Sequence, residues 1–174
     1  MKFSKRARSP GFAARDWCGE IAVVARLLFL TSSFPSTPDD GICGYIADLA
    51  AELVASHGHH VRVVTPAASG PTDDRGFAPT EIVRFTYPTP GAKAFSSDRD
   101  AGAALQSSPA AKAEAVVFLG AFARAARRES ALADAIVSHW LAPSGIVGAA
   151  LRCADRLHVA VAHGGDVHLL SATA

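Results

Sequence analysis

The sequence predicts an α/β fold: an open, mostly parallel sheet with helices on both faces. Short, continuously apolar segments alternate at least three times with segments of helical periodicity, a pattern typical of parallel strands joined by helices. Apolar residues make up 49% and charged residues 19% of the 174 residues, which is enough for a buried core and excludes wholesale disorder. No run of 18 uninterrupted apolar residues occurs, so a membrane-spanning helix is not expected.

Residues 26–174 are expected to form the structured domain, preceded by a flexible or wrongly assigned extension over residues 1–25. This extension is rich in Lys and Arg and lacks hydrophobic periodicity before Ile21. A signal peptide is the alternative, but Arg26 interrupts the apolar run, and no small-residue cleavage site follows before Pro35. The chain stops a few residues into what looks like a new helix, so we expect it to be truncated at the C-terminus.

The first half of the domain has the pattern of a βαβ unit. Residues 27–31 are almost entirely apolar, as in a strand covered on both faces, and residues 32–41 form a polar loop. The next segment places apolar residues at the spacing of one buried helix face: Ile46, Leu49, Ala50, Leu53 and Val54. Gly58 is expected to end this helix in the left-handed conformation, and residues 61–65 read as the second strand.

The second half continues the alternation. Residues 81–85 are expected to form a strand, followed by a long, proline-containing excursion over residues 86–110. A helix is expected over residues 111–128, with an apolar side made of Val117, Phe118 and Phe122.

After this helix, residues 135–138 and 157–162 are expected to be strands, joined by a helix that starts at Pro143 in its tolerated first turn. The buried face of that helix is expected to contain Ile146, Val147, Ala150 and Leu151.

Three polar clusters follow predicted strands, where ligands bind in parallel sheets. They are residues 32–44, residues 138–140 and residues 163–166. In the first cluster, Gly41 and Gly44 stand at a helix start, where glycine lets the backbone approach a ligand and free N–H groups attract an anion such as a diphosphate. A turn and helix cap is the plainer interpretation of this GxxG spacing, and Asp39 and Asp40 would repel a phosphate unless they point away.

The last cluster begins with His163, which ends a predicted strand and is followed by two glycines and Asp166. One interpretation is a tight turn in which Asp166 caps the next helix. The other places His163 in a cleft, where its imidazole can donate a hydrogen bond to a substrate oxygen at neutral pH. An esterase oxyanion loop is rejected because the sequence has no G-x-S-x-G motif.

The charge balance, the positions of cysteine and histidine, and the motifs that are missing argue against several other classes of function. The 17 Lys and Arg against 16 Asp and Glu give a net charge of +1, which argues against a nucleic acid partner. Three widely spaced cysteines predict neither a disulfide framework nor a zinc site, and favour a reducing, cytoplasmic location. His57, His59 and His60 straddle a helix end and are expected to be solvated, so no metal site is expected. A nicotinamide or flavin cofactor is disfavoured because no GxGxxG fingerprint is present, so no cofactor is expected.

Four segments in order resemble the N-terminal domain of family 4 retaining glycosyltransferases with the GT-B fold. They are LLFLTSSFP, GICGYIADLAAELVASHGHHVRVVTP, IVSHWLAPSGIVGAAL and VAVAHGGDVHLL. The resemblance implies one Rossmann-like half of a two-domain enzyme, in which this half mainly holds the acceptor and the other grips a nucleotide-sugar. The implied reaction transfers a hexosyl group from the nucleotide-sugar to a glycan or lipid-linked acceptor.

The resemblance also implies roles for individual residues. Gly41 and Gly44 correspond to the glycine-rich loop near the donor diphosphate, and His163 to the cleft histidine beside the transferred sugar. Asp166 would help to hold that turn.

On the acceptor side, the resemblance implies that His139 lines the cleft and that Trp140 forms a stacking wall. The loop from Pro88 to Pro109 would border the acceptor entrance.

The chain departs from the family in one respect. No two of its glutamates have the Glu-x7-Glu spacing of the family's second domain, which also supplies basic residues for the diphosphate. We therefore expect this chain alone to be inactive and to need a C-terminal domain or partner chain. The alternative is a non-catalytic module of the same fold that binds a carbohydrate or a partner. Peripheral contact of the basic N-terminal segment with an anionic membrane stays open.

Overall fold

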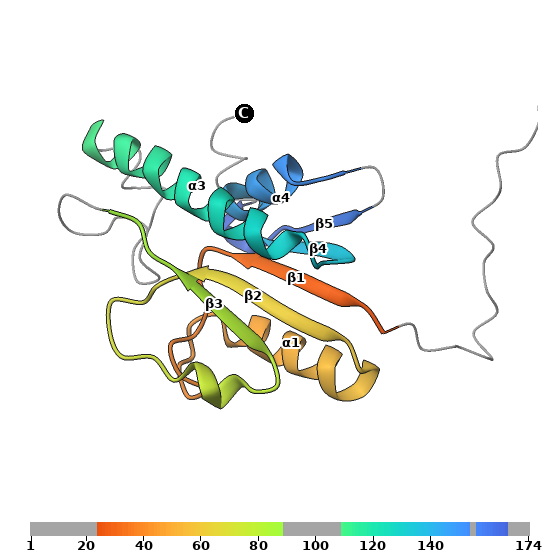
Figure 1. The fold of residues 1–174 in the computed structure, drawn as a ribbon. Helices are drawn as coiled ribbons and strands as arrows, with labels where there is room; N and C mark the ends of the chain where they lie inside the picture. The colour runs from red at the N-terminus through yellow and green to blue at the C-terminus, as the bar shows by residue number, and fades with distance from the viewer. Residues whose placement is uncertain (1–23, 89–108, 154–155, 167–174) are drawn as a thin grey trace, which may run out of the picture.

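The computed structural model describes residues 24–88, 109–153 and 156–166, and these form one parallel five-stranded sheet with helices on both faces (Figure 1). The strands are β1 (Arg26–Thr31), β2 (His60–Pro66), β3 (Glu81–Phe85), β4 (Ala135–His139) and β5 (Leu157–Val161). Each lies within one residue, at either end, of the bounds expected from the sequence. The predicted α/β, Rossmann-like fold class is confirmed.

Parts of the sequence-based expectations fall outside the described residues. These are the N-terminal extension up to residue 23, residues 89–108 of the long excursion, and residues 167–174 at the C-terminal end.

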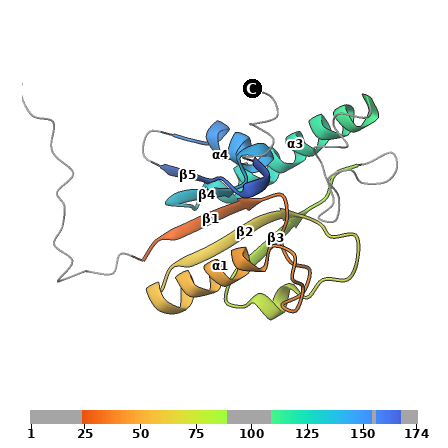
Figure 2. The ribbon, with the colours of Figure 1, turned by 180° about the vertical axis from the view of Figure 1, so that it is seen from behind.

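The helices cover the two faces of the sheet unequally. Helix α1 (Gly44–His57) lies on one face, whereas α3 (Pro109–Ser130) and the short α4 (Ile146–Ala150) lie on the other, as Figure 1 and the reverse view in Figure 2 both show. Helix α1 ends as expected at Gly58, which has a φ of 66° and whose N–H donates to the Val54 carbonyl. A short 3₁₀ turn, η1 (Asp74–Phe77), precedes β3.

Strand β1 is apolar throughout because its two faces bury different cores. Leu28 and Leu30 pack in the core under α3, which also contains Phe118 and Phe122. Phe29 points to the opposite face and packs in the core under α1. A strand covered on both faces needs apolar side chains at successive positions, which is why this segment does not alternate with polar residues.

The buried faces of the helices are narrower than the sequence pattern indicates. Ile46 and Ala50 are fully buried beneath α1, and Val147 is buried beneath α4. Leu49, Val117 and Ile146, which were expected on buried faces, are 41%, 42% and 56% exposed. The reason is geometric: each helix packs on a single sheet face, so apolar residues at the margin of its stripe remain in contact with solvent.

The expected helix start at Pro143 is wrong. The Ala142–Pro143 peptide is cis, and Ala142 has extended backbone angles (φ −131°, ψ 134°) inside a kinked turn, η2 (Leu141–Gly145). Regular helix begins only at Ile146. A proline can start a helix at its first turn. Here, however, an extended residue precedes Pro143, so the proline lies in the turn that follows β4 and not in a helix.

The spatial strand order β3-β2-β1-β4-β5 creates a switch point between β1 and β4. The chain moves outward from β1 to β3 and then returns to build β4 and β5 on the other side of β1. At this point the segments that follow β1 and β4 diverge, which in open parallel sheets leaves room for a ligand beyond the carboxyl ends of the strands.

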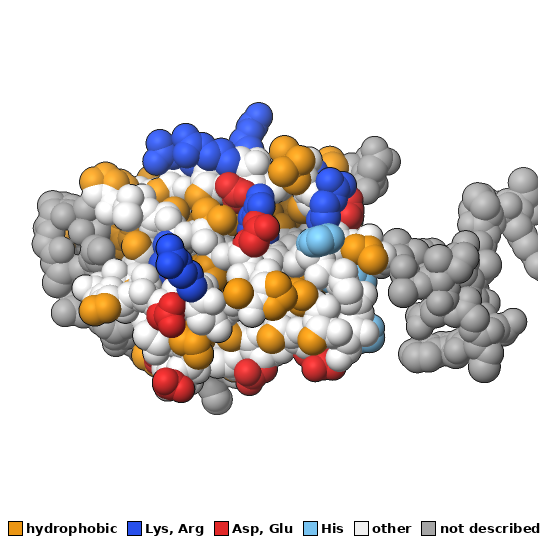
Figure 3. Space-filling model, turned by 60° about the horizontal axis from the view of Figure 1, so that its bottom comes forward, with side chains coloured by type: hydrophobic (Ala, Val, Ile, Leu, Met, Phe, Trp, Pro, Cys, Tyr) orange, Lys and Arg blue, Asp and Glu red, His pale blue; other side chains and the backbone are white. Residues whose placement is uncertain are grey.

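Charges of both signs share the face of the molecule that Figure 3 shows. Figure 3 shows basic and acidic side chains next to one another on the face in view, as the near-neutral net charge leads one to expect. Within the described residues, no helix combines the length and the apolar composition that crossing a membrane requires.

Gly148 permits the close packing of α4 on the sheet. A methyl group at Gly148 would overlap both the Ser138 hydroxyl and the His158 ring, which bond to each other at 3.0 Å. We expect Gly148→Ala to lower the free energy of unfolding by about 1–3 kcal/mol, the usual cost of overpacking a core. Urea denaturation measures this change.

Gly120 provides the matched control because it is exposed on α3, with open space where a methyl would lie. Gly120→Ala is expected to stabilise the protein by about 0.5–1 kcal/mol through helix propensity. Equal stability of the two variants would contradict the packing explanation.

Candidate functional site

The carboxyl ends of β1, β4 and β5 lie level with one another. In the parallel register, His139 at the end of β4 is the partner of Thr31 at the end of β1 and of Val161 at the end of β5. The polar clusters that follow these strands therefore meet at one edge of the sheet, beside the switch point.

His163 lies at this edge, in contact with three aromatic rings. Its ring centroid is 4.7 Å from that of Trp140, 5.1 Å from that of Tyr45 and 5.6 Å from that of His139, on which it stacks with an interplanar angle of 19°. The Tyr45 hydroxyl is 3.3 Å from Nδ1 and 3.4 Å from Nε2 of His163. The imidazole is half-buried, so its plane is fixed by packing while part of it remains accessible to a ligand.

Tyr45 joins the first cluster to the last, and the sequence analysis did not identify it. Gly44 is the first residue of α1 and Tyr45 the second, so the contact of Tyr45 with His163 places the glycine-containing segment and the histidine at the same edge. The sequence did hold one indication of such a role: Tyr45 is an aromatic residue directly after the GxxG segment, and it lies outside the apolar stripe of the predicted helix.

The two glycines leave open space at the start of α1. No heavy atom lies within 4 Å of where a Cβ would stand at Gly41 or Gly44. The left-handed backbone conformation falls instead on Cys43, with a φ of 55°. The glycines are therefore not explained by backbone conformation, and a ligand could approach the main chain at both positions.

The beginning of α1 carries no negative charge of its own. Its first turn contains no acidic residue, and no side chain caps its first N–H groups. Outside the helix, the carboxylate of Asp40 accepts from the Ile42 N–H just before the N-cap, so only the uncapped first-turn N–H groups favour an anion here.

Asp40 points into its own loop. Its two carboxylate oxygens accept hydrogen bonds from the backbone N–H groups of Ser36 and Ile42, and these bonds lower the pKa of the Asp40 carboxyl. On β3, Arg84 donates to the Pro35 carbonyl and to Asp74, which ties the beginning of the same loop to the sheet. Asp40 is therefore an ionised carboxylate whose two oxygens are both bonded to the backbone of its own loop.

Asp166 fixes the turn that carries His163. One oxygen of its buried carboxylate accepts hydrogen bonds from the backbone N–H groups of both His163 and Leu141, each at 3.0 Å. The same residue donates its own N–H to the His163 carbonyl. Asp166 thereby connects the segment after β5 to the kinked turn after β4.

His139 and Trp140 differ in their exposure. His139 is only 1% exposed and lies against Phe29, Tyr45 and His163, so its ring does not line the open surface as the sequence analysis expected. The physical reason is that α1 and the segment after β5 cover the end of β4. Trp140 is partly exposed and has a positive φ of 77°, with its ring against His163.

Burial alters the protonation of His139. Loss of solvation, together with the nearby His163, lowers the pKa of His139 to about 4. Neither ring nitrogen has a hydrogen-bond partner among the described residues. His139 is therefore a neutral ring beneath His163 at physiological pH.

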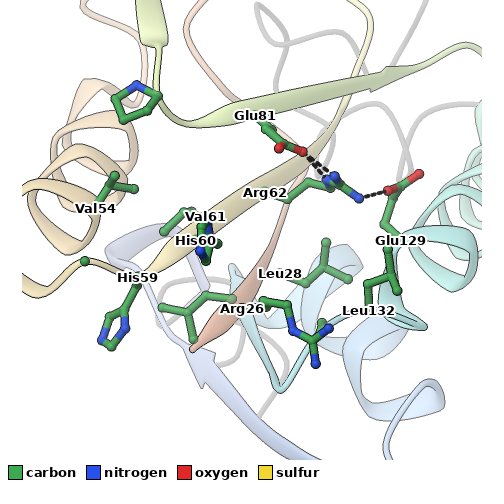
Figure 4. A pocket seen from close by; sticks show the side chains of 14 residues that line it. Arg26, Leu28, Val54, His59, His60, Val61, Arg62, Glu81, Glu129 and Leu132 are labelled. Atoms are coloured by element: carbon green, nitrogen blue, oxygen red, sulfur yellow. Dashed lines mark hydrogen bonds and ion pairs between the residues drawn. The ribbon is translucent and has the colours of Figure 1, made fainter. Parts of the chain in front are cut away.

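A cavity among the described residues lies at the opposite edge of the sheet, where the strands begin. It has a volume of about 490 Å³, and Figure 4 shows Arg62 inside it between Glu81 and Glu129. Arg62 bonds to Glu129 at 2.7 Å and also to Glu81, and the other lining arginine, Arg26, bonds to Asp134. These cations are already paired, and the amino ends of parallel strands are not the usual ligand edge.

The described residues include no group of three or more His, Cys, Asp or Glu side chains placed to hold a metal ion.

Comparison with known proteins identifies a family. A family model described as a glycosyl transferase 4-like domain matches residues 40–174, and no curated protein matches the chain. The matched range contains the start of α1, the end of β4 and the turn after β5, which are the three segments that meet at the carboxyl edge.

Proposed function

Since the chain belongs to the family of glycosyl transferase 4-like domains, we propose that it is the acceptor-side half of a retaining glycosyltransferase with the GT-B fold. The reaction moves a hexosyl group from a nucleotide-sugar to a glycan or lipid-linked acceptor. The other half, a C-terminal domain or partner chain, holds the nucleotide. The observation that carries this proposal is the contact between Tyr45 and His163, which brings the start of α1 and the histidine after β5 to one place at the switch point.

In this proposal, the start of α1 serves the donor diphosphate. During transfer, the bond between the sugar C1 and the diphosphate oxygen breaks, a bond from the acceptor oxygen to C1 forms, and the acceptor proton passes to the departing diphosphate. Negative charge therefore accumulates on the diphosphate. The open backbone at Gly41 and Gly44 and the uncapped first turn of α1 support a role in stabilising that charge.

His163 serves the transferred sugar. Its half-exposed imidazole donates a hydrogen bond to a sugar hydroxyl, and Asp166 holds the turn that presents it. Trp140 offers an apolar ring face on which a sugar can stack. His139 stacks on the buried side of the His163 ring and supports it. Because His139 is neutral, it adds no positive charge beside His163.

A transfer assay with two forms of the protein tests the proposal. The chain alone, and the chain joined to a C-terminal nucleotide-sugar-binding domain of the same family, are each supplied with a panel of nucleotide-hexoses and with glycan and lipid-linked acceptors. We expect the joined form to release nucleoside diphosphate and glycosylate an acceptor, with the anomeric configuration retained in the product by NMR. The chain alone should bind an acceptor without turnover.

The outcomes separate the two candidate functions. Acceptor binding without transfer by any joined form would replace the enzyme with a non-catalytic carbohydrate-binding module. Absence of both binding and transfer would overturn the proposal.

A further inference from the structure

We propose that the free edge of β5 pairs in antiparallel orientation with β5 of a second copy of the chain, about a two-fold axis at Val159. The two five-stranded sheets then form one continuous sheet. This pairing goes beyond the proposed function and uses no residue of the candidate site, so it can be tested without sugar transfer.

Strand β5 leaves backbone groups free on its outer side. It is the last strand in the order β3-β2-β1-β4-β5 and pairs with β4. The Val161 carbonyl accepts a hydrogen bond from the Trp140 N–H, so Val161 directs its backbone groups at β4. Because these groups alternate in direction along a strand, the N–H and C=O groups of His158 and Ala160 point away from the sheet. No residue that the structure describes makes a backbone hydrogen bond to this outer side.

Strand β5 lacks the usual protection of an edge strand. On the other edge of the sheet, β3 carries Glu81 and Arg84, which both form ion pairs, and charged residues of this kind discourage pairing with another chain. Strand β5 reads LHVAV, without an acidic residue, a Lys, an Arg or a proline. Leu157 and Val159 are 66% and 42% exposed. They lie on the side of the sheet where α1 packs against β2, three strands away, so no described helix covers them.

The sequence of β5 is self-complementary about Val159. In an antiparallel pair centred there, Val159 lies opposite its own counterpart, and His158 lies opposite Ala160 of the second copy. The pair of His158 with Ala160 is then the hydrogen-bonded one, so every outward backbone group of these residues gains a partner. On the α1 side of the sheet, Leu157 lies opposite Val161, and these apolar contacts cover side chains that are otherwise in solvent. An isologous pairing of this kind closes at the dimer.

The side chain of His158 does not obstruct the pairing. Its Nε2 lies 3.0 Å from the hydroxyl of Ser138 on β4, where Gly148 of α4 packs against both groups, so the ring is held over the neighbouring strand. The outer side of β5 is therefore left to its backbone and to the short side chains of Val159 and Ala160.

Sedimentation velocity of the full chain over a range of concentrations tests the pairing. The wild type should form a species of twice the 18.0 kDa of one chain. Val159→Lys places two like charges opposite each other at the two-fold axis and removes an apolar contact, so it should raise the Kd of the dimer at least about tenfold. Val159→Glu should do the same. An equal mixture of the two variants should restore the dimer, because opposite charges then face each other at the axis.

Val116→Lys is the matched control for these variants. Val116 is a valine on α3 that is 70% exposed, on the other face of the sheet from α1, and its substitution should leave the dimer unchanged. Circular dichroism checks that all the variants are folded.

Hydrogen exchange of the wild type gives a second readout that needs no variant. The amides of His158 and Ala160 should exchange at least about tenfold more slowly at concentrations where the dimer forms than where the chain is monomeric, since their N–H groups bond only across the axis. The amide of Val161, which faces β4, should not show this additional, concentration-dependent protection.

A wild type that stays monomeric at every concentration would overturn the inference. So would a dimer that Val159→Lys leaves intact, since the copies would then meet elsewhere, or a mixture of the two charge variants that remains monomeric, since Val159 would then not face itself. Open-ended species larger than the dimer would contradict the closed two-fold pairing. None of these outcomes depends on sugar transfer, so the proposed function and the pairing stand or fall separately.

Discussion

Replacing His163 with alanine is expected to lower the transfer rate of the joined, transfer-competent protein at least 100-fold. The substitution removes the imidazole that donates a hydrogen bond to the sugar, and loss of one preorganised hydrogen-bond donor in an active site costs about 10²–10³-fold in rate. The side chain is half-buried, and the turn around it is held through its backbone by Asp166, so the fold should be retained. Initial rates at saturating donor and acceptor measure the effect.

His57→Ala is the control for this experiment. His57 is an exposed histidine in the last turn of α1, far along the helix from Tyr45, and its removal should leave the rate within twofold of the wild type. Thermal unfolding of both variants checks that they remain folded. If His163→Ala retains the wild-type rate while folded, the histidine has no catalytic role, and the site must be sought among other residues.

The strands could be predicted from the sequence because burial on both faces leaves a local signal. The segment that forms β1 is apolar at consecutive positions, since Leu28 and Leu30 enter one core and Phe29 enters the other. Such a run is short, bounded by polar residues, and does not depend on which strands become its neighbours. The order β3-β2-β1-β4-β5, by contrast, depends on contacts between distant segments, and it was read from the structure.

Details of the helices were harder to predict because they depend on tertiary packing. Leu49 has the spacing of a buried position on α1, but it stays largely exposed, whereas Ile46 and Ala50 are fully buried. Pro143 has the local chemistry of a helix start, but a cis peptide and an extended Ala142 place it in a turn. Neither outcome is determined by the few residues around each position.

The candidate site was likewise predictable where the signal is local and not where it depends on contacts between distant segments. The sequence placed His163, Gly41 and Gly44 after strands, and the parallel register brings the strand ends level. It did not indicate that Tyr45 contacts His163, because the two residues are 118 positions apart. Nor did it indicate the burial of His139, which follows from the residues that cover the end of β4 rather than from any property of its own segment. The functional roles of these residues stay predictions.

His139 should make the folded state sensitive to acid. Its pKa is about 4 in the folded protein, because burial and the adjacent His163 disfavour the charged ring, and about 6.5 when unfolded. Between these values the unfolded chain binds more protons than the folded one. The free energy of unfolding should therefore be highest above about pH 6.5 and fall as the pH decreases towards 4, by about 3 kcal/mol in total. Urea denaturation between pH 7.5 and 4.5 measures this loss.

His139→Phe isolates the contribution of this residue, because it keeps a buried ring and removes the titrating group. Its pH profile over the same range should be flatter than that of the wild type. The remaining slope should include His158, whose pKa burial also lowers, whereas Asp134, whose pKa Arg26 lowers to about 2, loses its contribution mainly below this range. His57→Gln, at an exposed position, should retain the wild-type profile. An unchanged slope in His139→Phe would show that His139 is not held neutral beneath His163, and the support that it is proposed to give the catalytic ring would then be absent.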